Sequence, residues 1–240
     1  MNLIEIREKF KELSGRYDLV NDDNSDNGAN FFINEGSKYL DRLHKSKNSW
    51  TYNFQPLAEG EYVISIPYCR AISKVIVSSD ENEWEVERKS LEYVLGYYFP
   101  IQSSYENGKP SYYAISLVHP TMGDFTGYNT ETLLTAISSI HSADGREFNT
   151  IIFNVPAEGD LTVAIKGLFY SPLLINDEDV NYWSDVHPML LVMAAIRQTE
   201  VLNRNIEGIR TWTESIMNEI KGIGQDWIEE ESATALRMEG

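Results

Sequence analysis

The chain has little cysteine, few basic residues and no long apolar run. Cys69 is the single cysteine among 240 residues, which excludes an intrachain disulfide and a cysteine-rich zinc site. The longest apolar run, residues 189–196, is far too short to span a bilayer. The N-terminus MNLIEIREKF lacks the apolar core of a signal peptide. We therefore expect a soluble protein without membrane contact, folded in a reducing cytoplasm.

Basic residues are outnumbered, with 20 Lys and Arg against 37 Asp and Glu, for a net charge of −17. Such a surface repels phosphate backbones, which argues against a protein that reads the sequence of DNA or RNA. The simplest consequence of the charge is solubility. An acidic wall also suits the lining of a channel through which DNA slides without binding.

Helical signals lie at both ends of the chain. The strongest covers residues 185–220, where Pro188 suits a first helical turn. Apolar positions recur there at three- and four-residue spacing, which predicts amphipathic helices. Two N-terminal helices are predicted in the same way, the first ending at Ser14-Gly15. The residues that form these stripes are Leu3, Ile6, Phe10, Leu13, Phe32, Gly36, Tyr39, Leu40, Leu43, Leu190, Met193, Ala194, Arg197, Val201, Ile209, Trp212, Ile216 and Ile220.

Between the helical ends, short aromatic and β-branched segments separated by turns predict strands. These segments are residues 62–66, 72–77, 84–88, 112–118, 149–155 and 161–170. We expect residues 156–159 to form a hairpin turn between the last two strands, and residues 119–147 are compatible with a helix or an irregular excursion.

The expected fold class is α+β, a helical bundle formed by the N- and C-terminal helices with an inserted β-rich domain. The bundle comprises residues 1–48 and 184–222. The inserted domain covers residues 49–183, with a short helix near 90–98. A flexible acidic tail is expected over residues 223–240.

No pattern predicts chemistry. The four histidines have no metal-ligand spacing; they are His44, His119, His141 and His187. The loop Asp22–Gly28 resembles a calcium loop but lacks the glutamate at its twelfth position. Cys69, beside Arg70, has no evident base partner. We therefore predict no catalytic, cofactor-binding or metal-binding residue, and no enzyme.

Carboxylates and aromatic residues are less easily assigned. Pairs such as Glu85 and Glu87 are too common in so acidic a chain to single out. The clusters Tyr97-Tyr98-Phe99 and Tyr112-Tyr113 could stack on bases or sugars, although core or subunit interface suits their acidic surroundings better.

Several motifs, taken in their order along the chain, resemble one known family. The opening LIEIREKFKELSGRYDL and then FINEGSKYLDRL, from Phe32 to Leu43, resemble the start of head-to-tail adaptor (connector) proteins of tailed bacteriophages. The middle is similar at Tyr62–Ile66, Trp84–Arg88, Ser90-Leu91, Gly108–Pro110 and Tyr112–Ile115. The end is similar at Pro156–Gly159, Gly167–Pro172, Asn181–Trp183 and His187–Leu191. The likeness covers most of the chain except residues 119–147.

The resemblance implies a structural virion protein of the neck or tail, made in the host bacterial cytoplasm. It implies a homo-oligomeric ring, expected to be a dodecamer, that binds the portal protein and tail or nozzle proteins. DNA would pass through its channel without specific binding, and no cofactor is needed. Alternatives are another neck or tail protein, of the tail-completion or tube type, and a carbohydrate-active protein that uses the aromatic β insertion.

Overall fold

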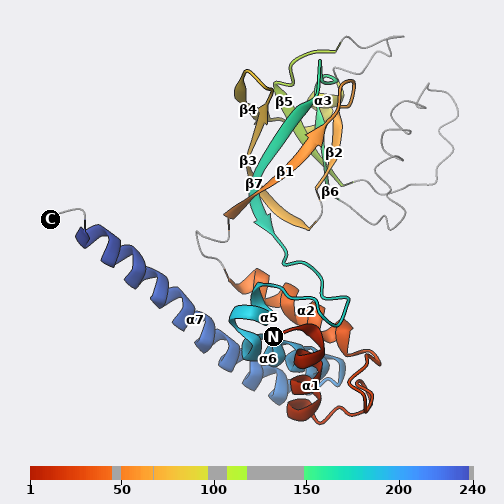
Figure 1. Ribbon diagram of the computed structural model, residues 1–240, viewed down its shortest axis with the longest axis vertical. Helices are drawn as coiled ribbons and strands as arrows, with labels where there is room; N and C mark the ends of the chain where they lie inside the picture. Colours follow the sequence, from red (N-terminus) through yellow and green to blue (C-terminus); the bar gives the residue numbers. More distant parts are fainter. Residues whose placement is uncertain (45–49, 67, 97–106, 118–148, 238–240) are drawn as a thin grey trace, which may run out of the picture. The chain divides into compact units, whose positions relative to one another are not determined.

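The chain divides into two compact units, each of which has its own apolar core. A computed structural model describes residues 1–44, 50–66, 68–96, 107–117 and 149–237, with the side chains described to residue 225. One unit combines residues 1–49 with 170–240, and the other contains residues 50–169. We call them the helical unit and the sheet unit (Figure 1).

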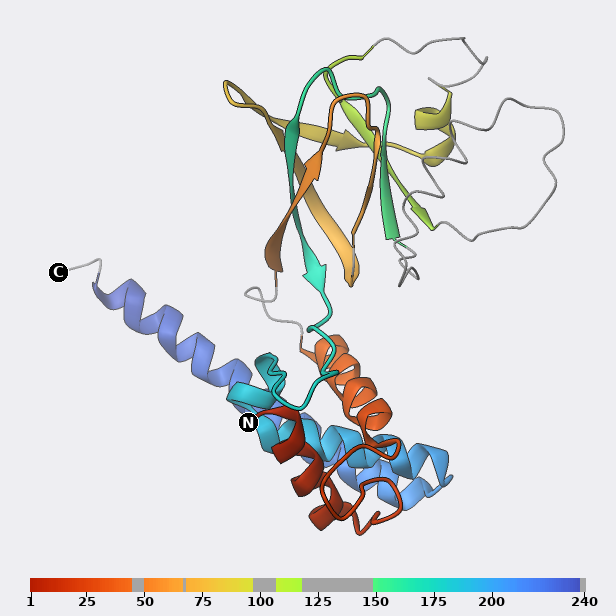
Figure 2. The same ribbon diagram turned by 45° about the vertical axis from the view of Figure 1, so that its right-hand side comes forward.

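The helical unit is built around α6, which packs against α2, α7 and α1. Its helices are α1 (Leu3–Ser14), α2 (Ala29–Leu43), α5 (Tyr182–Val186), α6 (Pro188–Leu202) and α7 (Ile206–Arg237). Leu3, Ile6 and Phe10 of α1 are fully buried in its core, as their spacing predicts. At about 1.5 Å per residue, the 32 residues of α7 extend well beyond the 15 residues of α6 (Figures 1 and 2).

Local sequence sets the helix ends. Asn2 and Glu5 form a capping box at the start of α1, and Gly15 ends that helix in the left-handed conformation. The side chain of Asp26 accepts hydrogen bonds from the backbone N–H groups of Gly28 and Asn30, so it caps the start of α2. These caps define the loop that connects α1 to α2.

The sheet unit contains a mixed seven-stranded sheet in the order β1-β7-β3-β4-β5-β6-β2. Its elements are β1 (Trp50–Leu57), β2 (Val63–Ser65), β3 (Cys69–Ser78), β4 (Glu83–Arg88), α3 (Leu91–Leu95), β5 (Tyr112–Leu117), β6 (Asn149–Phe153) and β7 (Leu161–Phe169). All pairings are antiparallel except β4 with β5. The end strands β1 and β2 approach one another, so the sheet nearly closes into a barrel (Figure 2).

The expected fold class was wrong. We expected a helical bundle formed by the two chain ends as the frame, with a β-rich domain inserted. The structure instead has a seven-stranded mixed sheet, nearly closed into a barrel, together with helices. The amphipathic stripes are strong local signals, whereas the pairing of β1 with β7 joins residues more than a hundred positions apart, such as Trp50 and Leu168.

Three further expectations differ from the structure. Residues 156–159 do not join paired strands, because β6 pairs with β5 and β2, whereas β7 pairs with β1 and β3. Residues 170–183, expected in the β-rich domain, belong to the helical unit. The helix expected to end near residue 222 continues to Arg237. Residues 119–147 lie outside the described residues, and so does the segment from 97 to 106.

Candidate functional site

Asp41 of α2 joins that helix to residues 171–183, which precede α6 within the helical unit. One carboxylate oxygen accepts hydrogen bonds from Ser171 Oγ at 2.9 Å and from Trp183 Nε1 at 2.7 Å, and the other accepts one from the Ser171 backbone N–H at 2.7 Å. Trp183 is 1% exposed. The carboxylate is therefore engaged in fixing the chain rather than directed at a substrate.

Asn34 makes a second link of the same kind. Its amide donates to the Leu174 carbonyl and accepts from the Leu174 N–H, both at 2.9 Å. Asn181 adds a third link, because its Nδ2 donates to Ser37 Oγ and to the Pro172 carbonyl. These polar side chains replace the strand or helix partners that residues 171–181 lack.

Gly36 lets α2 and α6 approach closely. A Cβ atom at this position would lie 2.7 Å from the Ala195 nitrogen and 3.0 Å from the Ala194 carbonyl carbon. Backbone atoms of a neighbouring helix cannot move aside as a flexible side chain can. The glycine is therefore required by packing.

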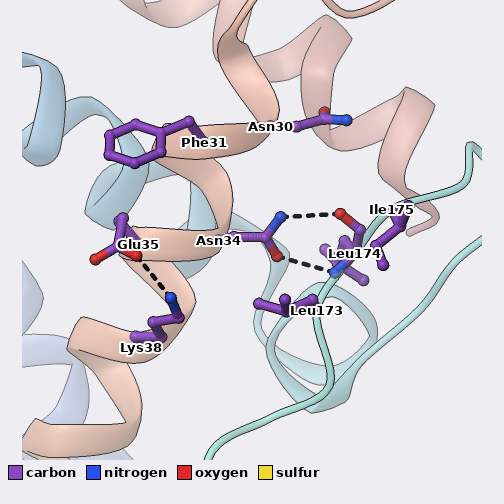
Figure 3. A pocket seen from close by; sticks show the side chains of 8 residues that line it. All are labelled: Asn30, Phe31, Asn34, Glu35, Lys38, Leu173, Leu174 and Ile175. Atoms are coloured by element: carbon purple, nitrogen blue, oxygen red, sulfur yellow. Dashed lines mark hydrogen bonds and ion pairs between the residues drawn. The ribbon is translucent and has the colours of Figure 1, made fainter. Parts of the chain in front are cut away.

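A shallow hollow of about 360 Å³ lies between the outer face of α2 and the segment 173–175. Figure 3 shows Asn34 bound to Leu174 on one side of α2, whereas Phe31 and Glu35 extend from the other side. Phe31 is 66% exposed and Ile175 is 69% exposed. The residues that line the hollow are Asn30, Phe31, Asn34, Glu35, Lys38, Leu173, Leu174 and Ile175.

The two charged residues that line the hollow have opposite signs. Glu35 pairs with Lys38 at 2.7 Å, and Ile175 is followed by the exposed carboxylates of Asp177 and Glu178. Asp177 forms an ion pair with the buried Arg7. The hollow therefore has a mixed lining of apolar and polar side chains, and its one cation and one anion are paired.

The turn between α6 and α7 is a second exposed apolar surface. We call residues 201–206 the corner. Its backbone forms a Schellman motif, in which the Asn205 N–H bonds to the Glu200 carbonyl and the Arg204 N–H bonds to the Val201 carbonyl. Arg204 has φ of 57°, a left-handed conformation for which glycine is preferred. Leu202 and Ile206 on either side are 64% and 80% exposed.

The predicted absence of catalytic or metal-binding histidines can be examined for two of the four. His44 is 8% exposed and lies 5.5 Å from the Trp183 ring, centroid to centroid, and His187 lies 6.2 Å from the same ring. Burial lowers the pKa of His44, although Asp41 opposes this shift. No sequence pattern indicates that these histidines, separated by 142 intervening residues, approach one tryptophan. His119 and His141 lie outside the described residues.

The calcium-like loop is held by its own hydrogen bonds. Hydrogen bonds from the side chain and the backbone N–H of Ser25 lower the pKa of Asp23, and Asp26 caps α2. Across the residues that the structure describes, no three His, Cys, Asp or Glu side chains converge as a metal site requires. Cys69 is buried, and burial raises the pKa of its thiol, which disfavours a nucleophilic thiolate.

The remaining candidates lie in the sheet unit. Glu85 pairs with Lys74 at 2.8 Å and Glu87 with Lys89 at 2.5 Å, so each carboxylate has its own cation. Tyr112 packs edge-to-face on Tyr93. Tyr113 is 3% exposed and belongs to the core of the sheet unit. The sequence analysis favoured a core or interface position for it over stacking on bases or sugars. The cluster Tyr97-Tyr98-Phe99 lies outside the described residues.

A scan against protein-family models finds no match, and a search of the curated proteins finds no relative. None of the helices in the described ranges has both the length and the apolar character needed to cross a membrane. Function must therefore be argued from the residues and their geometry.

Proposed function

We propose that this chain is a non-enzymatic structural protein of a tailed-bacteriophage virion, a head-to-tail adaptor. It assembles as a homo-oligomeric ring beneath the portal, extends the DNA channel and provides a docking surface for tail proteins. In this proposal the protein is made in the host cytoplasm and functions in the neck of the virion.

The observation that carries the proposal is where the motif residues lie. Asn34, Gly36 and Asp41 come from the motif FINEGSKYLDRL, and Ser171 and Trp183 come from motifs more than a hundred residues later. In the structure Asp41 binds Ser171 and Trp183, Asn34 binds the backbone of Leu174, and Gly36 packs against the backbone of α6. Their polar groups are used inside the protein, which favours an architectural role over catalysis.

The net charge of −17 supports the same role. A ring whose channel is lined by carboxylates repels the DNA backbone and lets it slide, whereas a basic lining would retain it. The proposal requires that acidic side chains face the channel in the assembled ring.

Electron microscopy of the protein mixed with the portal protein of the same phage tests the proposal. A closed ring with a central pore, seated on the portal, is the expected result. A protein that stays unbound over a wide concentration range, with no ring on the portal, would contradict it.

A glycan-binding role is the second candidate, favoured by a row of aromatic side chains on β1. Trp50, Tyr52 and Phe54 occupy alternate positions and are 36%, 46% and 66% exposed, and Lys166 lies 5.7 Å from the Tyr52 ring centroid. Exposed rings of this kind have an apolar face available for stacking. Quenching of tryptophan fluorescence by oligosaccharides, lost in Tyr52→Ala, would support this role over the adaptor role.

A further inference from the structure

Strand β1 has one side along which no strand is paired. It stands at the end of the sheet order, and among the strands that the structure describes it pairs with β7 alone. The other end strand, β2, approaches β1 without pairing with it. Thr51 lies on the same face of β1 as the buried Leu57 but is itself exposed, so β1 is uncovered near its start. The backbone groups on the free side of such an edge strand are a template for another strand.

The sequence of β1 lacks the charges that usually protect an exposed edge. Residues 50–57, WTYNFQPL, contain no charged residue, although 24% of the chain is charged. Pro56 removes a single N–H group, near one end of the strand. Two copies of a chain with a net charge of −17 repel one another. An uncharged strand is therefore the place where two copies can approach at the smallest electrostatic cost.

The pattern of β1 is complementary to itself in the antiparallel direction. Aromatic residues alternate with polar ones, namely Trp50, Tyr52 and Phe54 with Thr51, Asn53 and Gln55. If two copies pair with Asn53 opposite Asn53, Tyr52 lies opposite Phe54 of the second copy, and Thr51 lies opposite Gln55 of the second copy. A shift by one residue would place aromatic side chains opposite polar ones. A shift by two residues would leave fewer of the uncovered positions 50–56 paired.

We infer that β1 of one copy pairs antiparallel with β1 of a second copy, with Asn53 at the centre. The backbone groups on the free side of each β1 then bind the other copy, and the two sheets become continuous. Directly opposite aromatic side chains stabilise neighbouring strands, and the pair of Tyr52 with Phe54 occurs twice in this contact. Because both copies use the same surface, the contact is isologous and closes at two copies. The inference is independent of the proposed function, because such a contact does not by itself build a ring.

Disulfide trapping in the full-length protein tests the pairing. The native chain provides the background, because Cys69 is buried. Asn53→Cys should form a covalent dimer under mild oxidation, since directly opposite Cβ atoms in antiparallel strands lie about 4.5–5.5 Å apart. Thr51→Cys and Gln55→Cys should each stay monomeric alone, whereas an equal mixture of the two should dimerise. The chain that carries both changes should stop at dimers, because both disulfides join the same two copies.

Thr162→Cys is the matched control. Thr162 is exposed on β7, which is flanked by β1 and β3 and has no free side. A dimer from Thr162→Cys as abundant as that from Asn53→Cys would mean random collision and would overturn the inference. Dimers from Thr51→Cys alone would overturn it in favour of another register, and a ladder of higher oligomers from the chain with both changes would exclude an isologous contact.

A lysine on the edge should abolish the pairing, as it does on natural edge strands. Phe54 is 66% exposed, so Phe54→Lys should keep the native fold. Added to Asn53→Cys, it should lower the dimer yield to that of Thr162→Cys, whereas Tyr17→Lys, at a position of the helical unit that is 67% exposed, should not change the yield. Analytical ultracentrifugation of the native chain should show a dimer that dissociates on dilution and is lost in Phe54→Lys. A monomer at every concentration would refute the inference.

Discussion

Replacing Gly36 with alanine should destabilise the helical unit, although alanine is the better helix former. Two opposed effects can be compared. Alanine in a helix interior is more favourable than glycine by about 1 kcal/mol. Against this, the new Cβ would lie 2.7 Å from the Ala195 nitrogen and 3.1 Å from the Ala195 Cα, well inside the about 3.5 Å at which carbon contacts become favourable.

The second effect should dominate because the obstacle is backbone. Relieving the overlap requires α6 to move away from α2, and these two helices form the main helix–helix contact of the unit. Overpacking of a well-packed core costs about 1–3 kcal/mol. Because the neighbouring atoms cannot rotate aside, we take the upper part of that range and expect a net loss of about 2 kcal/mol, or a fall in Tm of roughly 5–10 °C.

Gly222→Ala provides the matched control. Gly222 lies in α7, and no heavy atom would lie within 4 Å of a Cβ added there. The same substitution should therefore stabilise the helical unit by up to about 1 kcal/mol. Urea denaturation followed by circular dichroism measures both variants. Equal signs for the two substitutions would refute the argument that α6 backbone, rather than helix propensity, decides the result at Gly36.

Three further predictions concern Asp41, Arg204 and His44. Asp41→Ala should lower the unfolding free energy by about 3 kcal/mol, because the Trp183 indole N–H and the Ser171 N–H lose their acceptor; urea titration checks this. Arg204→Gly should raise the unfolding free energy by about 0.5–1 kcal/mol, since glycine adopts the left-handed conformation without penalty; urea titration checks this too. Stability should fall as pH drops below about 6.5, because the lowered pKa of His44 means that the unfolded chain binds the proton more tightly; replacement of His44 by glutamine should flatten this dependence in thermal melts from pH 8 to pH 5.

The helices could be predicted from the sequence because their signal is local. Leu3, Ile6 and Phe10 recur at helical spacing and are buried, and Gly15 ends α1. The same periodicity does not show which apolar residues of a stripe are buried. Leu13 and Val201 continue the predicted apolar faces but are 50% and 45% exposed. A stripe identifies the apolar side of a helix, but it does not tell whether that side is covered within the same chain.

Strand β1 was not predicted because its pattern is inverted. Tyr52 and Phe54 face solvent, whereas Asn53 and Gln55 are partly buried and Pro56 interrupts the run. The alternation of aromatic and polar residues, taken alone, would place the aromatic side chains on the buried face of the sheet.

The false hairpin has a different cause. Ala157 donates its N–H to the Glu61 carbonyl and accepts from the Gly60 N–H, so the turn after β6 binds the turn before β2. The chain then crosses to pair β7 with β1 and β3. Residues 156–159 therefore contain no sequence pattern that indicates that β7 pairs with β1 and β3.

The site divides between residues that sequence patterns could suggest and residues that they could not. Asn34, Gly36 and Asp41 stood in recognisable motifs, and each is now explained by an internal contact. Leu202 and Arg204 stood in no motif, because a corner is defined by the end of one helix and the start of the next. Residues that fix a shape are tied to fixed neighbours, as Asp41 is tied to Ser171 and Trp183. In related chains we therefore expect these three residues to remain together, whereas an exposed turn such as residues 201–206 is free to vary.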